Sequence, residues 1–193
     1  MSRLLAFLCL TVLLTTGCAT RQVQGSLAGS TAQRLVTYSI DELMEALPAE
    51  DFEPLRNQSL WLNSNFVEDG ELKQYADQRL RLALKQRFGI SFAKSKTQSD
   101  ARLSVFYTSL ATDQELAGFY LPLGVIPGFQ EQTQINLITL EKFHGIAELF
   151  YFIESDGQVQ RGSKLLRRTK TDALGLPIIT IPLTRLPDGE DQR

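Results

Sequence analysis

The side chains that could carry out catalysis are few and scattered in this sequence. His144 is the only histidine, so a Ser-His-Asp arrangement would depend on this residue alone. Its position in Lys-Phe-His-Gly is more typical of a turn between two strands. Acidic residues lie close together at three places, which are Glu68–Asp69, Asp113 with Glu115, and Glu154 with Asp156. Because paired carboxylates hydrolyse glycosides only at a suitable separation, these pairs support no more than an alternative hypothesis of a small carboxylate-dependent hydrolase.

The residue types also limit the metals and cofactors that the chain can hold. One histidine excludes a histidine cluster, and the two cysteines, Cys9 and Cys18, both lie in the first eighteen residues. Carboxylates could still bind Ca²⁺ or Mg²⁺, but the sequence has no EF-hand loop. The motifs of nucleotide-binding loops, zinc proteases and serine hydrolases are also missing from the sequence. We therefore expect no cofactor, no metal and no catalytic residues.

The first eighteen residues, MSRLLAFLCLTVLLTTGC, have the pattern of a signal for export. Arg3 supplies a basic start, and the apolar run Leu4–Leu14 is too short to span a bilayer permanently. Small residues then precede Cys18, and this arrangement resembles the lipobox of bacterial lipoproteins. That resemblance implies cleavage before Cys18, a diacylglyceryl group on its sulfur and a further acyl chain on its amine. An ordinary cleaved signal is the alternative.

The residue after the cysteine bears on localisation. Ala19 follows Cys18, where an aspartate would resemble the retention signal of the inner membrane. In a Gram-negative cell, the resemblance therefore implies an outer-membrane lipoprotein that faces the periplasm. Export removes one base, Arg3, from a chain of 20 basic and 22 acidic residues. The small negative charge that remains gives no reason to expect nucleic acid as a partner.

The domain organisation follows from composition. Residues 1–17 are the expected signal peptide, and residues 18–30 are the lipidated cysteine with a small, polar, flexible tether. We predict a single domain over residues 31–187, because this length is enough for one core. Residues 188–193 are expected to fray.

Hydrophobic periodicity predicts two helices and several strands. The helices are expected at 30–47, with an alternative start at a capping box beginning at Ser39, and at 69–88, with Gly89 just after its end. Strands are expected at 58–64, 90–94, 101–110, 133–142 and 145–155, with a hairpin turn at Asp156–Gly157 and a proline-containing edge strand near the end. This order predicts an α+β fold, with a mostly antiparallel sheet of about five strands and two helices packed on one face.

The segment 115–130, ELAGFYLPLGVIPGFQ, combines large apolar residues with glycine and proline, and it predicts an apolar loop. Such a loop either folds over the sheet as part of the core or forms an exposed surface that contacts a partner or lipid. On the second interpretation the contact residues are Phe119, Tyr120, Leu121 and Phe129. The runs at 133–155 are long enough to cross a membrane as a hairpin, but their poor alternation favours a soluble sheet.

From about Thr31 to Leu186 the chain resembles a family of bacterial lipoproteins that carries a domain of unknown function. The resemblance rests on Cys18 and on the stretches TAQRLVTYSIDELMEAL, FEPLRNQSLWLNSNF, QYADQRLRLALKQRFGI, SDARLSVFYTSLATD and LPLGVIPG. It implies no activity and no catalytic residues. A third of the chain is also similar to the periplasmic domain of curli-secretion-type lipoproteins, through a helix, a strand and the pair Asp100–Ala101.

These observations favour a lipid-anchored, non-enzymatic envelope protein that binds a partner or supports an assembly. Its expected partners are the membrane, through the N-terminal acyl chains, and an envelope protein. The alternatives are a subunit of an oligomeric export or pore complex, and the small carboxylate-dependent hydrolase.

Overall fold

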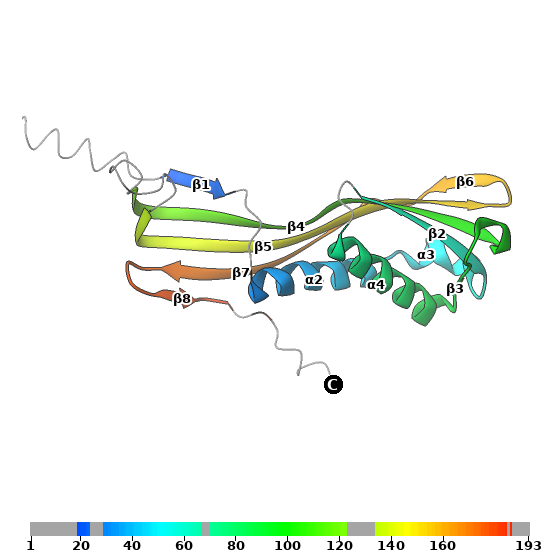
Figure 1. Cartoon of the computed structure of the whole chain (residues 1–193), viewed down its shortest axis with the longest axis horizontal. Coiled ribbons are helices and arrows are strands. Elements are labelled where there is room, and N and C mark those ends of the chain that lie inside the picture. The colour runs from blue at the N-terminus through cyan, green and yellow to red at the C-terminus, as the bar shows by residue number, and fades with distance from the viewer. Residues whose placement is uncertain (1–18, 24–28, 67–69, 123–133, 185, 187–193) are drawn as a thin grey trace, which may run out of the picture. The chain divides into compact units, whose positions relative to one another are not determined.

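The structure, a computed structural model, describes residues 19–23, 29–66, 70–122, 134–184 and 186. Its helices are α2 (Ser30–Glu45), α3 (Ala49–Phe52) and α4 (Glu71–Phe88), with 3₁₀ turns at Glu53–Leu55 and Lys96–Gln98. Its strands are β1 (Ala19–Val23), β2 (Ser59–Asn65), β3 (Ser91–Phe92), β4 (Ala101–Pro122), β5 (Gln134–Ser155), β6 (Gln158–Arg161), β7 (Leu165–Gly175) and β8 (Thr180–Pro182). Figure 1 shows these elements along the chain. The α+β class predicted from the sequence is confirmed.

The strands form one mixed sheet, and its details differ from the prediction. The order is β3-β2-β4-β5-β7-β8, with β1 added to β4 and β6 added to β5, which makes eight strands instead of about five. The β2 strand is parallel to both β3 and β4, whereas β1–β4, β5–β6 and β7–β8 are antiparallel. Parallel neighbours need a crossover connection, and α4 lies in the sequence between β2 and β3.

The chain divides into two compact units, which are described separately below. Unit 1 comprises residues 1–27, 113–144 and 170–193, and unit 2 comprises residues 28–112 and 145–169. The long strands β4, β5 and β7 each contribute residues to both units. The single domain predicted for residues 31–187 stays a prediction.

Unit 2 contains the main hydrophobic core. The helices α2 and α4 contact each other, and their buried side chains form one cluster with β2, β4 and β5. Alternate residues of β4 point into this cluster, namely Leu103, Val105 and Tyr107. Helix α4 ends as the sequence predicts, because Gly89 adopts a left-handed conformation and its N–H donates to Lys85.

Both long strands differ from the prediction. The loop expected at 115–130 is wrong for residues 115–122, which continue β4, and the break expected at His144 is wrong because β5 runs through it. In each strand a glycine permits a close approach. A Cβ on Gly118, whose φ is +147°, would lie 2.7 Å from Thr139 Cα in the neighbouring β5. Glycine inside a strand therefore marks a backbone contact here and not a break.

Ser39 lies inside α2 and not at its start, which corrects the alternative helix start at this residue. Its buried hydroxyl donates to the Gly145 carbonyl over 2.8 Å, and it accepts a hydrogen bond of 3.1 Å from the Thr169 N–H. A single hydroxyl thereby connects α2 to both β5 and β7. Because two of these partners are backbone groups, loss of this hydroxyl would weaken the hydrogen bonding of buried polar atoms.

Three tyrosines of unit 2 donate hydrogen bonds to aspartates. The pairs are Tyr75–Asp41 at 3.1 Å, Tyr107–Asp77 at 3.0 Å and Tyr151–Asp51 at 2.5 Å. Burial, together with the neighbouring carboxylate, raises the pKa of each phenol above its ordinary value. As the pH rises, the unfolded chain therefore releases these protons at a lower pH than the folded chain does. Their contribution to stability is complete below about pH 10 and is lost as the pH rises further.

Replacing Tyr151 with phenylalanine tests this coupling. The change removes a hydrogen bond to a charged group, so we expect the free energy of unfolding at pH 7 to fall by about 1.5–3 kcal/mol. Above about pH 10 the wild type loses the phenol's contribution, and the difference should narrow. Urea unfolding of both proteins between pH 7 and 11 measures this. The control is Tyr38→Phe, the same substitution at half-buried Tyr38, whose hydroxyl accepts a hydrogen bond from Arg34 over 3.3 Å. A constant difference between Tyr151→Phe and the wild type across this pH range would contradict the prediction.

Candidate functional site

In unit 1, one row of residues crosses the sheet from β1 to β8. Ala19 pairs with Gly118, and Gly118 lies against the backbone of Thr139. The Thr139 hydroxyl donates to the Gly175 carbonyl over 3.4 Å, and Gly175 pairs with Thr180 of β8. We call these five residues the Gly118 row. The row fixes the register of β1, β4, β5, β7 and β8 relative to one another.

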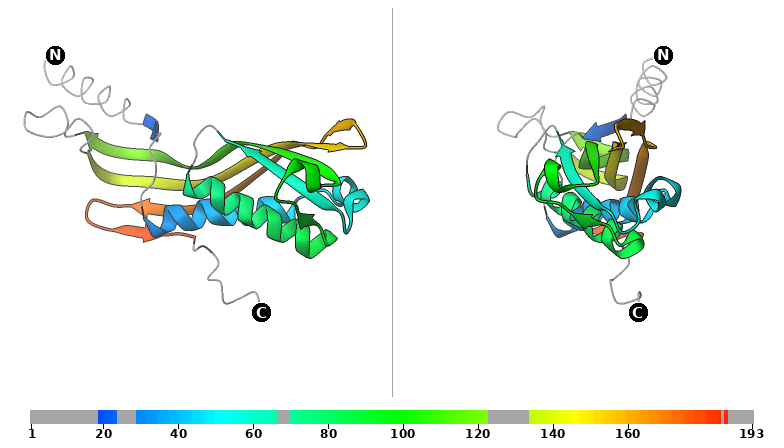
Figure 2. Two further views of the ribbon diagram at one scale, coloured as in Figure 1. Left: turned by 45° about the vertical axis from the view of Figure 1, so that its right-hand side comes forward. Right: turned by 90° about the vertical axis from the view of Figure 1, so that its right-hand side faces the viewer.

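The chain segments that leave this row on one side share a composition. They are residues 119–122 at the end of β4, residues 134–137 at the start of β5, and residues 176–179 in the β7–β8 turn. None of these residues carries a charge. Figures 1 and 2 show that the end of β4, the start of β5 and this turn lie at the same end of unit 1.

The same segments expose large apolar side chains. Ile178 at the turn is 99% exposed and Phe119 is 45% exposed. We call the exposed residues beyond the Gly118 row the apolar end, and they are Phe119, Ile135, Leu137, Ile178 and Ile179. Further exposed apolar residues of unit 1 are Ile138, which directly precedes Thr139 of the row, and Ile181 and Leu183, which lie behind the row. Unit 1 therefore holds most of the exposed large hydrophobic residues in the described part of the chain.

The contact residues suggested by the sequence fall only partly within this region. Phe119 is exposed and belongs to the apolar end. Tyr120 and Leu121 lie in β4, but their side chains are outside the described part of the structure, and Phe129 is outside it altogether. Cys18 also lies outside the described residues, although its neighbour Ala19 begins β1. Within the stretch predicted as a tether, residues Ala19–Val23 thus pair with β4.

The first ionisable residue after the uncharged part of β5 is Glu141. Burial raises the pKa of its carboxyl group. This shift is consistent with a local environment that disfavours charge.

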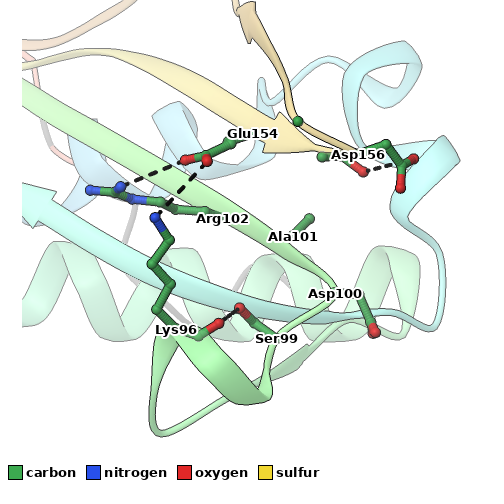
Figure 3. Close-up of a pocket in the computed structure, with 9 residues that line it drawn as sticks. Lys96, Ser99, Asp100, Ala101, Arg102, Glu154 and Asp156 are labelled. Atoms are coloured by element: carbon green, nitrogen blue, oxygen red, sulfur yellow. Dashed lines mark hydrogen bonds and ion pairs between the residues drawn. The ribbon is translucent and has the colours of Figure 1, made fainter.

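Unit 2 has a small polar pocket of about 140 Å³, shown in Figure 3. Arg102 and Lys96 point toward Glu154, at 3.6 Å and 4.0 Å between their nitrogen and oxygen atoms. Asp156 lies apart at the turn. The Asp100 carboxylate accepts a hydrogen bond from Ser59 N–H and thereby holds β2 against β4. The acidic pair Glu154 and Asp156 therefore does not converge on one point, and Glu154 is occupied by ion pairs.

The face of the unit 2 sheet opposite the core carries aromatic residues whose contacts the sequence did not predict. Phe106 stacks on Phe150 with 5.0 Å between ring centroids, and Phe152 meets both rings edge-on. The guanidinium of Arg102 lies 4.9 Å from the Trp61 ring centroid. Strand alternation places Phe150 and Phe152 on one face, but their contact with Phe106 depends on the β4–β5 pairing.

The remaining candidates give no site in the part of the chain that the structure describes, and the acidic pair Glu68–Asp69 lies outside that part. His144 lies within β5, so it is not a turn residue. Among the described residues, no group of three or more histidine, cysteine or acidic side chains is placed to hold a metal ion. No helix in the described ranges is long and apolar enough to cross a membrane. Comparisons with protein-family models and with curated proteins find no match for this chain.

Proposed function

We propose that this chain is a lipid-anchored protein of the bacterial cell envelope that works as a non-enzymatic binding or assembly module. Cys18 carries the anchor, and unit 1 carries the contact surface. In a Gram-negative cell it is an outer-membrane lipoprotein that faces the periplasm. The observation that supports this function is the concentration of exposed apolar side chains on the strands of unit 1. A surface of this kind is typical of a site of protein or membrane contact.

A second observation favours the related function of a subunit in an oligomeric export or pore complex. The strands β4 and β5 each contain 22 residues, which is far longer than the usual five or six. In unit 1, Leu137 and Ile138 are both exposed, and adjacent residues of a strand point to opposite faces. Light scattering of the protein extracted in detergent distinguishes the two functions, since the second requires a defined oligomer.

The hydrolase has the least support. Its best acidic pair is separated, and Glu154 is balanced by Arg102 and Lys96. A general acid requires a carboxyl group whose pKa is raised in a cleft that admits substrate. The carboxyl group whose pKa is raised, that of Glu141, belongs to unit 1, whereas the pocket belongs to unit 2.

Site-specific photocrosslinking in cells tests the proposed contact surface. A photoreactive residue at Leu183 of unit 1, 54% exposed, is compared with one at Val159 of unit 2, 67% exposed. We expect one discrete crosslinked envelope protein from Leu183 and none from Val159. Equal, diffuse crosslinking at both positions would contradict a partner surface on unit 1. Mass spectrometry of the N-terminus in the same preparation checks acylation of Cys18.

A further inference from the structure

We infer that the apolar end of unit 1 rests in the lipid surface of the membrane that holds the anchor. This inference depends on the proposed acylation of Cys18, and it assigns lipid as the occupant of one part of the exposed surface. Its basis is the Gly118 row, which relates the origin of the acyl chains to the exposed apolar residues.

The position of the anchor follows from the pairing of β1. Antiparallel pairing places Ala19 beside Gly118 and Val23 beside Gln114. Ala19 is therefore the end of β1 that lies nearer to Phe119 and the apolar end. Cys18 is bonded directly to Ala19, and consecutive Cα atoms are about 3.8 Å apart. The acyl chains consequently start within about one residue of the row.

The chemistry of these segments suits lipid. Three chain segments leave the row without a charged residue, and each contributes an exposed large apolar side chain. Burial of this apolar area contributes favourable free energy at about 25 cal/mol per Å². Because the segments lack charge, they carry no cost of moving an ionised side chain out of water.

The length of the described segments is compatible with an interfacial contact. Residues 119–122 extend about 13 Å beyond the row at roughly 3.3 Å per residue. A spanning strand needs about 9–11 residues, whereas an interfacial element buries its apolar face about 5–10 Å deep. The described part of the apolar end therefore fits the headgroup boundary. The acyl chains supply the attachment, and this contact would hold unit 1 against the membrane surface.

Fluorescence of the lipidated full-length protein in vesicles tests this inference. Ile178→Cys introduces a single reactive thiol, because Cys9 leaves with the signal and Cys18 is acylated. An environment-sensitive fluorophore is attached there, and the protein is reconstituted into phosphatidylcholine vesicles with or without brominated phosphatidylcholine. The matched control carries the same fluorophore at Val159→Cys, an exposed apolar position of unit 2. Both side chains are exposed, so neither change disturbs the core.

We expect blue-shifted emission at position 178 and quenching of about two-fold or more by brominated lipid, since an interfacial apolar face lies within the reach of acyl chains. Position 159 should keep the emission of a probe in water. Water-like emission at 178 would overturn the inference. A blue shift at 178 without lipid quenching would also overturn it, because a protein would then cover the position. Equal quenching at 159 would overturn a contact specific to the apolar end.

This experiment tests the proposed anchor and the proposed surface contact separately. If mass spectrometry finds no acyl group on Cys18, the proposed function fails, and the inference fails with it. If Cys18 is acylated and the probe at 178 remains in water, only the inference fails. Repeating the measurement in vesicles with anionic lipid adds a check, since an uncharged contact should show the same quenching in both.

Discussion

Replacing Cys18 with serine is expected to abolish acylation and to lower the amount of protein in the outer-membrane fraction by about ten-fold or more. Each buried acyl CH₂ contributes about 0.8 kcal/mol, and one chain alone binds only marginally, so loss of three chains removes the attachment. The measurement combines incorporation of an alkyne-labelled fatty acid with separation of membranes by density. Separation by density is needed because an uncleaved precursor keeps its apolar run, Leu4–Leu14, and would stay with the inner membrane.

The chain offers a matched control for this change. Cys9→Ser makes the same substitution nine residues earlier, inside the apolar run of the proposed signal peptide. This variant should be acylated, cleaved and located like the wild type. A Cys18→Ser protein that still incorporates the fatty acid, or still sediments with the outer membrane, would show that the anchor lies elsewhere. The prediction is independent of the apolar end, whose lipid contact alone is interfacial and weak.

Helices α2 and α4 could be predicted from the sequence because their signals are local. A helical face repeats every three to four residues, and Gly89 gives a left-handed end that few other residues adopt easily. The prediction failed inside α2 at Ser39, where a polar residue normally indicates a cap. There the hydroxyl is satisfied by Gly145 and Thr169, which lie more than a hundred residues away. No local pattern could indicate these partners.

The sheet was harder to predict because strand direction and strand length depend on distant partners. Alternation in β2 is the same for parallel and antiparallel neighbours, so its parallel pairing was not evident. Gly118 and Pro122 indicated a loop, yet the backbone of β5 lies close against Gly118, and Pro122 ends the strand. Tertiary contact outweighed the preference of these residues for irregular structure.

One part of the candidate site could be predicted from the sequence, and another part could not. The lipobox around Cys18 and the exposed Phe119 could be proposed from the sequence, because one is a short motif and the other an unusual composition. The Gly118 row could not be predicted, since it depends on register among five strands that are far apart in the chain. Without that register, nothing relates the anchor to Ile178, which follows it by 160 residues.

Gly145→Ala is expected to cause the largest loss of stability, with a fall of about 3 kcal/mol or more in the free energy of unfolding. A Cβ at this position would lie 2.8 Å from Val36 N and closer still to the Leu35 carbonyl group. Both are backbone atoms of α2, so no side chain can rotate away to relieve the contact. The melting temperature should fall by about 6–12 °C, at 2–4 °C per kcal/mol for a chain of this size. The control Gly70→Ala adds a Cβ with nothing within 4 Å and should cost less than about 1 kcal/mol.

A double-mutant cycle with Ser39→Ala shows whether the added methyl group displaces α2. In the wild type, Ser39→Ala removes the hydrogen bonds to Gly145 and Thr169 and should cost about 1–3 kcal/mol. If Gly145→Ala moves α2 away from β5, these bonds are already broken, and Ser39→Ala should cost markedly less in that background. The coupling should reach about 0.5–3 kcal/mol, as for residues in one hydrogen-bond network. Strict additivity would mean that the hydrogen bonds of Ser39 survive the added methyl group, which would contradict a displacement of α2 from β5.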